Sequence, residues 1–427
     1  MGRQLRIVFG LVAVMCVAAT SVAGAAPARD EHTERRRAES GAVLEWNQHA
    51  TDSLIGNAGQ APGVAAIHLA MVHAAVYDAV NAIDRGHDPY LAAPAARRWY
   101  STDAAAAAAA HRVLASVLPT QQSHLDELYA ASLAAIPDGR AEDGGVAVGE
   151  ATAATTLSAR ADDGRFGPFR FTAGTAPGQW RPTPPSFATD PNAWVSQVTP
   201  FLLERPDQFR SQGPNALTST RYARDLAEVR EVGSATSTSR TADQTDTARF
   251  WVENGAATWS RITRSLSAER HLDNTDNALL FARVYLTGAD AAIACFNDKA
   301  HWGTWRPITA IREADTDGNP ATVADPGWTP LIATPPFPEH PSGHGCMSGS
   351  IASTLRSYFG SDRVRFSATS ATSGTTRTFT GFSDALDEVV DARVWAGIHF
   401  RTADEQGATI GAQVAHWSRT HYFRPTR

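Results

Sequence analysis

Three short motifs between residues 299 and 399 carry side chains suited to holding an oxyanion. The first joins Lys299 to Arg306, and Lys299 is the single lysine of a chain with 38 lysine and arginine residues. A compact ammonium and a planar guanidinium are different anion donors, so one lysine kept among arginines indicates a specific task. A helix here would place both cations on one face, although Pro307 favours a helix end. Either arrangement lets the two cations converge. From this motif alone, the alternative is a surface lysine that was kept by chance.

The second motif is the segment PPFPEHPSGH over residues 335–344, which precedes a helical pattern over residues 345–359. Ser342 is placed to cap that helix with its side-chain oxygen. The backbone N–H groups of Gly343 and His344 then point out of a helix start, where the helix dipole also favours an anion. His344 in the first turn can act as an acid or a base there. The alternative is a capped helix with an incidental histidine.

The third motif is ARVWAGIH over residues 392–399. Gly397 is typical of a residue just past a helix end, so Arg393 would close one helix and His399 would lie in the following turn. Residues 402–405 match a capping box that opens the next helix. This geometry lets Arg393 and His399 point into one pocket. The alternative is a surface arginine and a core histidine.

The elements that must position these motifs are predicted to be helices. Alanine-rich segments between residues 63 and 160 repeat apolar side chains at helical spacing. Residues 166–214 hold nine of the 24 prolines together with many aromatic residues, which predicts an ordered, irregular crossing. We therefore predict an all-α protein of two packed helical bundles. Residues 43–215 would support the site, and residues 216–427 would carry it.

Taken together and in this order, the motifs resemble the signature of the vanadium-dependent haloperoxidases and the related acid phosphatases of the phosphatidic acid phosphatase type 2 superfamily. The strong part of the resemblance covers residues 290–404. A looser part extends to residues 73–81 and to the proline-rich crossing, both reminiscent of bacterial haloperoxidase-like proteins. The resemblance implies the same fold of two helical bundles.

The resemblance also implies a role for each motif residue. In this superfamily three cations, a Ser-Gly pair and two histidines hold a tetrahedral oxyanion. The donors to that anion would be Lys299, Arg306, Ser342, Gly343 and Arg393. His399 would bind the central atom, which is the vanadium of a vanadate cofactor in a haloperoxidase and phosphorus in a phosphatase. His344 would be the acid–base residue.

Two enzyme reactions remain open on these residues. In a haloperoxidase the reactants would be hydrogen peroxide, a halide and a small organic acceptor, and Lys299 would polarise the bound peroxide. In an acid phosphatase His399 would attack phosphorus to give a phosphohistidine. Residues 335–338 look like the chloroperoxidase branch, where a phenylalanine borders the halide site, so a haloperoxidase is the leading prediction. A site that binds phosphate or vanadate without turnover is a third possibility.

Three positions depart from the family pattern. Phe296 stands where fungal chloroperoxidases carry tryptophan, which leaves the halide open. Ala392 replaces the usual serine before the arginine. In the family an aspartate follows the histidine by four residues, whereas Asp404 follows His399 by five. Either Asp404 or a backbone carbonyl could therefore be the group that orients His399.

The N-terminus resembles a secretory signal peptide over residues 1–25, with a basic start, an apolar run and a small-residue cleavage site. We therefore expect a secreted or periplasmic protein, with no later segment long and apolar enough to span a membrane. The net charge is −6 and no long basic stripe occurs, which disfavours nucleic acid as a partner. Two cysteines, Cys295 and Cys346, lie outside the predicted signal peptide. They could form a disulfide or remain as two buried thiols, and the sequence leaves both alternatives open. No pattern predicts the oligomeric state.

Overall fold

The computed structural model describes residues 41–426, so the predicted signal peptide over residues 1–25 lies outside the described residues. The first half contains these helices: α2 (Gly41–Thr51), η1 (Asp52–Asn57), α3 (Pro62–Asp84), α4 (Thr102–Val117), η2 (Pro119–Gln121), α5 (Gln122–Ala134) and α6 (Arg140–Ala159). The second half contains η3 (Ala193–Gln197), α7 (Thr220–Val232), α8 (Ala242–Phe250), α9 (Gly255–Arg270), α10 (Asn274–Trp302), α11 (Pro307–Arg312), η4 (Ala314–Thr316), α12 (Gly343–Phe359), β1 (Phe366–Thr369), β2 (Thr376–Phe379), α13 (Phe382–Trp395) and α14 (Arg401–His421).

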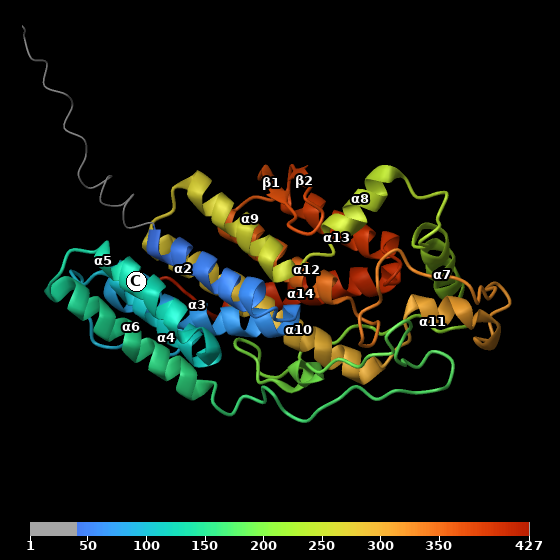
Figure 1. Ribbon diagram of the computed structural model, residues 1–427, viewed down its shortest axis with the longest axis horizontal. Coiled ribbons are helices and arrows are strands. Elements are labelled where there is room, and N and C mark those ends of the chain that lie inside the picture. The colour runs from blue at the N-terminus through green and yellow to red at the C-terminus, as the bar shows by residue number, and fades with distance from the viewer. Residues whose placement is uncertain (1–40, 427) are drawn as a thin grey trace, which may run out of the picture.

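The molecule is elongated, with α2–α6 gathered at one end and α7, α8 and α11 at the other (Figure 1). Helices α10, α12 and α14 lie between the two groups, and α10 packs along both α3 and α12. The predicted helical class is confirmed. The exception is a two-stranded antiparallel hairpin in which Phe366 of β1 pairs with Phe379 of β2. Helix α9 is also unpredicted, because serine, threonine and arginine interrupt its apolar face.

Helices α3 and α10 form the centre of the core. Both are long and apolar enough to cross a membrane, contrary to the expectation from the sequence, but other parts of the protein bury them. A helix that is apolar all round is buried in the core of a large protein, and the alanine-rich surface of α3 fits that position. The division of the chain at residues 215 and 216 stays a prediction.

The proline-rich crossing is ordered without forming an α-helix between residues 161 and 219. It is fastened to α10 by the fully buried Asp290, whose carboxylate accepts the N–H groups of Phe201 (2.6 Å), Leu202 (2.7 Å) and Leu203 (2.8 Å). This anchor lays the crossing over the middle of α10.

Helices α12 and α14 pack closely because glycines line their contact. A Cβ atom added to Gly407 would lie 2.6 Å from the Ser342 carbonyl oxygen, and one added to Gly411 would lie 2.2 Å from that of Cys346. The start of α12 is thereby held directly against α14. The predicted capping box over residues 402–405 is wrong, because α14 begins at Arg401 and Thr402 already lies within its first turn.

Candidate active site

A cavity of about 440 Å³ opens where the start of α12 and the turn between α13 and α14 face the crossing and the loop before α12. Predicted site residues on its wall are Gly343, His344, Arg393 and His399. The remaining wall is mostly apolar and includes Val195, Phe296, Pro336, Phe337 and Met347. The second and third motifs therefore meet around one largely apolar space, whereas no residue of the first motif lines it.

His399 lies in the turn that follows α13, as the sequence predicts. Gly397 provides that turn with a φ of +80°, and a Cβ atom there would lie 2.3 Å from the Gly233 carbonyl oxygen. His399 is buried, with its Nδ1 2.9 Å from Oε1 of Glu339. The same oxygen accepts the Phe400 N–H at 3.0 Å. Glu339 is therefore the partner that orients His399, and Asp404 is not.

Glu339 was not among the predicted site residues. It is the one carboxylate within the motif over residues 335–344, and that position was the available signal. Sixty residues separate it from His399, so only the packing of the loop against the turn brings them together. Burial raises the pKa of Glu339 to about 7, against the opposing effect of the neighbouring Arg306.

The protonation of His399 follows from its neighbours. Burial lowers its pKa well below the ordinary value, and the Arg306 guanidinium adds to that effect. The imidazole is then neutral, and its Nδ1 proton points at Glu339. This tautomer leaves an unshared electron pair on Nε2, the nitrogen that a metal or phosphorus atom requires.

Two buried guanidinium groups lie beside this imidazole. Arg306 caps α11, donates from Nε to the Phe337 carbonyl at 2.8 Å and approaches His399 Nε2 with Nη1 at 3.2 Å. Arg393 donates from Nη1 to the Trp251 carbonyl at 2.8 Å. Within residues 41–426, Nη2 of Arg306 and Nε of Arg393 have no hydrogen-bond partner. A buried donor without an acceptor is costly, so these two N–H groups fit an oxyanion ligand.

Lys299 occupies a different position from the one predicted. Its fully buried ammonium donates to the carbonyls of Pro338 (3.0 Å), Glu339 (2.9 Å) and Pro341, and the residue does not line the cavity. An ammonium has three protons, and all three are used here. Lys299 therefore fastens the loop that carries Glu339, and its contact with an anion stays a prediction.

Replacing Lys299 with methionine is expected to lower the free energy of unfolding by about 3 kcal/mol or more. The substitution leaves three buried carbonyls without a donor, and each such loss costs ~1–3 kcal/mol. Denaturant unfolding measures the effect. Arg356→Met, which removes an exposed cation in the last turn of α12, is the control. Equal stabilities of the Lys299 variant and the wild type would show that the loop does not depend on this ammonium.

The start of α12 forms as predicted. Ser342 is the N-cap, and its Oγ accepts the Gly345 N–H at 3.3 Å. His344 follows in the first turn, with Nε2 3.4 Å from the Glu253 carbonyl oxygen. Burial, followed by the charge of Arg393, lowers the pKa of His344 well below its ordinary value. A neutral His344 at the cavity wall can accept a proton and return it.

A segment over residues 251–254, between α8 and α9, supports both motif residues through its carbonyls. Trp251 accepts from Arg393, and Glu253 accepts from His344. We call this segment the carbonyl clamp. Sequence motifs gave no signal for it, because a backbone carbonyl is present at every position.

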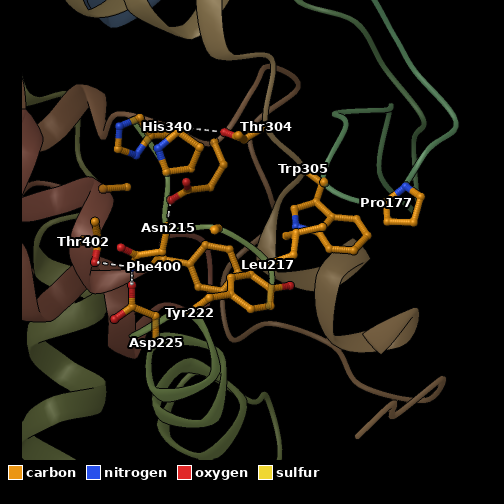
Figure 2. Close-up of a pocket in the computed structure, with 15 residues that line it drawn as sticks. Pro177, Asn215, Leu217, Tyr222, Asp225, Thr304, Trp305, His340, Phe400 and Thr402 are labelled. Carbon is orange, nitrogen blue, oxygen red and sulfur yellow. Dashed lines mark hydrogen bonds between the residues drawn. The ribbon is translucent and has the colours of Figure 1, made fainter. Parts of the chain in front are cut away.

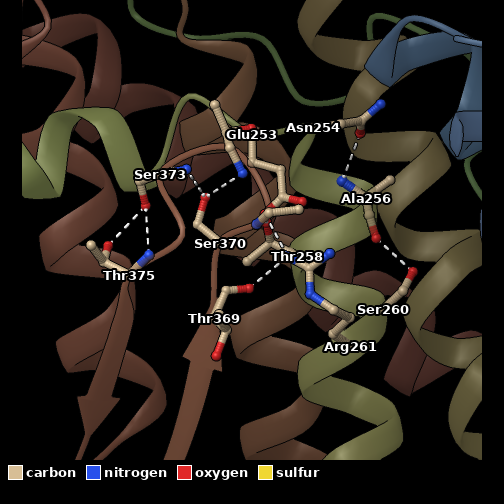
Figure 3. Close-up of polar contacts among 12 residues, drawn as sticks. Glu253, Asn254, Ala256, Thr258, Ser260, Arg261, Thr369, Ser370, Ser373 and Thr375 are labelled. Carbon is tan, nitrogen blue, oxygen red and sulfur yellow. Dashed lines mark hydrogen bonds and ion pairs between the residues drawn. The ribbon is translucent and has the colours of Figure 1, made fainter.

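The Glu253 side chain holds the carbonyl clamp in place (Figure 3). Its Oε2 accepts from Thr258 Oγ1 at 2.9 Å and from the Ala371 N–H at 3.3 Å, and it forms an ion pair with Arg261. Glu253 is buried, so these bonds are shielded from water. One carboxylate thus joins α9 and the β1–β2 hairpin to the carbonyl that faces His344.

Replacing Glu253 with alanine is expected to reduce turnover about tenfold and to shift its pH profile. The loosened carbonyl would no longer fix His344, and a positioned acid–base group contributes ~10²–10⁴-fold. Steady-state rates over a pH series measure both effects. Glu269→Ala, an exposed carboxylate on the following helix α9, is the control. An unchanged pH profile in the Glu253 variant would limit this residue to a structural role.

Two further groups lie beneath the site. Asp404 is buried beside Ser342, and burial raises the pKa of its carboxyl well above the ordinary value, against the opposing effect of Ser342. Cys295 and Cys346 are buried free thiols, and Cys295 Sγ lies 3.6 Å from the Pro341 carbonyl oxygen. Burial, reinforced by Cys295, raises the pKa of the Cys346 thiol. The structure therefore favours the alternative of two thiols.

Comparison with known proteins agrees with this geometry. A family model described as the VCPO second helical-bundle domain matches residues 279–426. The vanadium chloroperoxidase of Curvularia inaequalis is 28% identical over 204 residues, which are 41% of this chain and 32% of that protein. The match therefore spans about a third of the relative's length.

Solved structures share the fold over most of the chain. The crystal structure described as the first bacterial vanadium-dependent iodoperoxidase has a TM-score of 0.77 at 22% identity, covering 92% of this chain and 98% of that one. A holo-type bacterial vanadium-dependent chloroperoxidase has a TM-score of 0.68 at 19% identity, covering 84% and 92%.

Residues 279–426 thus match the second helical-bundle domain described by the VCPO family model, and most of the chain shares the helical fold of the solved structures. The buried guanidinium groups beside His399 are chemically suited to an oxyanion.

Proposed function

We propose that this protein is a vanadium-dependent haloperoxidase that oxidises a halide with hydrogen peroxide at a vanadate group beside His399. The observation that carries the proposal is the pairing of a neutral, Glu339-oriented His399 with two buried guanidinium groups whose N–H groups lack acceptors. Vanadate, when bound, supplies a Lewis-acidic centre that activates peroxide. The site residues fit it, because one imidazole nitrogen and several cationic donors are available.

The protein's residues have separable tasks in this proposal. Arg306 and Arg393 neutralise the anion's oxygens through charge-assisted hydrogen bonds, and the N–H groups at the start of α12 add to them. His344 would take a proton from hydrogen peroxide and return it to the departing hydroxide, which leaves as water, while the carbonyl clamp fixes its ring. The apolar wall around Phe337 excludes water and leaves a halide weakly solvated.

Vanadate-dependent bromination tests this proposal against the phosphatase alternative. Protein stripped of bound anions at acidic pH is reloaded with vanadate in phosphate-free buffer, and bromination of a phenolic dye by bromide and peroxide is followed. Bromination that requires vanadate and is suppressed by phosphate would support the proposal. Hydrolysis of a simple phosphomonoester that vanadate inhibits, without bromination, would assign the chain to phosphatase chemistry. Vanadate binding with neither reaction would leave an anion-binding protein.

We also propose that the protein is exported, on the basis of the leader-like pattern over residues 1–25. Sequencing the N-terminus of the mature protein after secretion tests this directly. A mature protein that begins near residue 26 is expected. Retention of Met1 in the purified cellular protein would contradict export.

A further inference from the structure

A second cavity of about 270 Å³ is lined by Glu339, the partner of His399. Figure 2 shows its wall. His399 lines the first cavity, and Glu339, whose Oε1 lies 2.9 Å from His399 Nδ1, lines the second. The second cavity is built from the crossing, α7, the segment before α11, the loop before α12 and the first turn of α14. No part of the proposed haloperoxidase reaction uses it.

The charged groups on this wall are acidic. Glu339 and Asp225 line the cavity, and their mutual repulsion contributes to the raised pKa of Glu339. Within the described chain no lysine or arginine lines it, although Arg306 and Lys299 act on Glu339 from outside the cavity. The first cavity, by contrast, presents Arg393. The two spaces therefore select ligands of opposite charge.

One oxygen of Glu339 is left without a partner. Oε1 accepts from both His399 and the Phe400 N–H, whereas no donor within residues 41–426 bonds Oε2. Glu339 as a whole is only 2% exposed, and it lines this cavity, from which a ligand can approach it. Asp225, across the cavity, accepts from Asn215 Nδ2 at 3.0 Å. A positively charged ligand would satisfy Oε2 and relieve the repulsion between the carboxylates.

Aromatic rings form much of the remaining wall. Tyr222 and Phe400 lie with ring centroids 5.9 Å apart, and Trp305 lines the cavity near them (Figure 2). Aromatic faces attract cations, and such walls recognise organic ammonium groups in other proteins. A bare metal ion is disfavoured, because no group of three or more His, Cys, Asp or Glu side chains among the described residues is placed to hold one.

We propose that the second cavity binds a small organic cation, an ammonium group with an apolar body, between Glu339 and Asp225 and against the aromatic rings. Because Glu339 also orients His399, an occupant of this cavity would touch the same carboxylate that fixes the imidazole. The proposal does not rest on the haloperoxidase reaction.

Isothermal titration of the full chain with choline tests this site, with its neutral carbon isostere 3,3-dimethylbutan-1-ol as the matched ligand. No vanadate or peroxide is present, so failure of the haloperoxidase proposal would not affect the result. Choline is expected to bind at least tenfold more tightly than the isostere. Equal affinities for choline and the isostere, or no choline binding up to millimolar concentration, would overturn the proposal. This test needs only the wild-type protein.

Asp225→Asn then locates the site. We expect it to weaken choline binding at least tenfold, whereas Glu231→Gln, an exposed carboxylate on the same helix, should leave the affinity unchanged. Thermal unfolding of each variant confirms that it is folded. Unchanged affinity in a folded Asp225 variant would place the cation elsewhere and overturn the assignment to this cavity.

Discussion

Replacing His399 with alanine is expected to reduce vanadate-dependent bromination by more than about 100-fold. Changes in residues that only orient a metal ligand typically cost 10–100-fold, so loss of the ligand itself should exceed that range. Glu339→Gln should fall within it, because the imidazole stays but loses the carboxylate that selects its tautomer. The ranking of these two variants therefore separates ligation from orientation.

The measurement compares rates with vanadate affinity in each variant. His416→Ala, an exposed histidine on α14, is the control for loss of an imidazole. His399 is buried, so circular dichroism and thermal unfolding must first show that the variant is folded. Full activity in a folded His399→Ala protein would remove the basis for the whole site assignment.

Replacing Arg393 with glutamine is expected to weaken binding of vanadate and of phosphate by about 10–100-fold. The substitution removes the charge and the buried Nε–H that lacks an acceptor, and hydrogen bonds to charged groups contribute ~1.5–3 kcal/mol each. Both anions should weaken together, since the guanidinium recognises oxygens and not the central atom.

Competition between phosphate and vanadate measured by calorimetry checks this result. Arg419→Gln, an exposed arginine in the last turn of α14, is the matched control. Unchanged anion affinity in Arg393→Gln would mean that water, and not the anion, accepts the Nε–H of Arg393 in the wild-type protein. The cavity would then not be the oxyanion site.

Sequence alone determined the helical class and the local geometry of each motif. The serine cap at residue 342 and the glycine turn at residue 397 are decided by neighbouring backbone atoms, so their signals are contained within a few residues. For the same reason the positions of His344 and His399 at element ends were predictable. The apolar repeats likewise predicted most of the helices that hold these motifs.

Tertiary structure alone decided the partners of these residues. Glu339 faces His399, the carbonyl clamp over residues 251–254 faces His344 and Arg393, and backbone carbonyls take all three protons of Lys299. Each contact joins segments that are dozens of residues apart, and most of the acceptors are carbonyls, which no residue type distinguishes. The second cavity arises in the same way, because its wall exists only where five separate segments pack together.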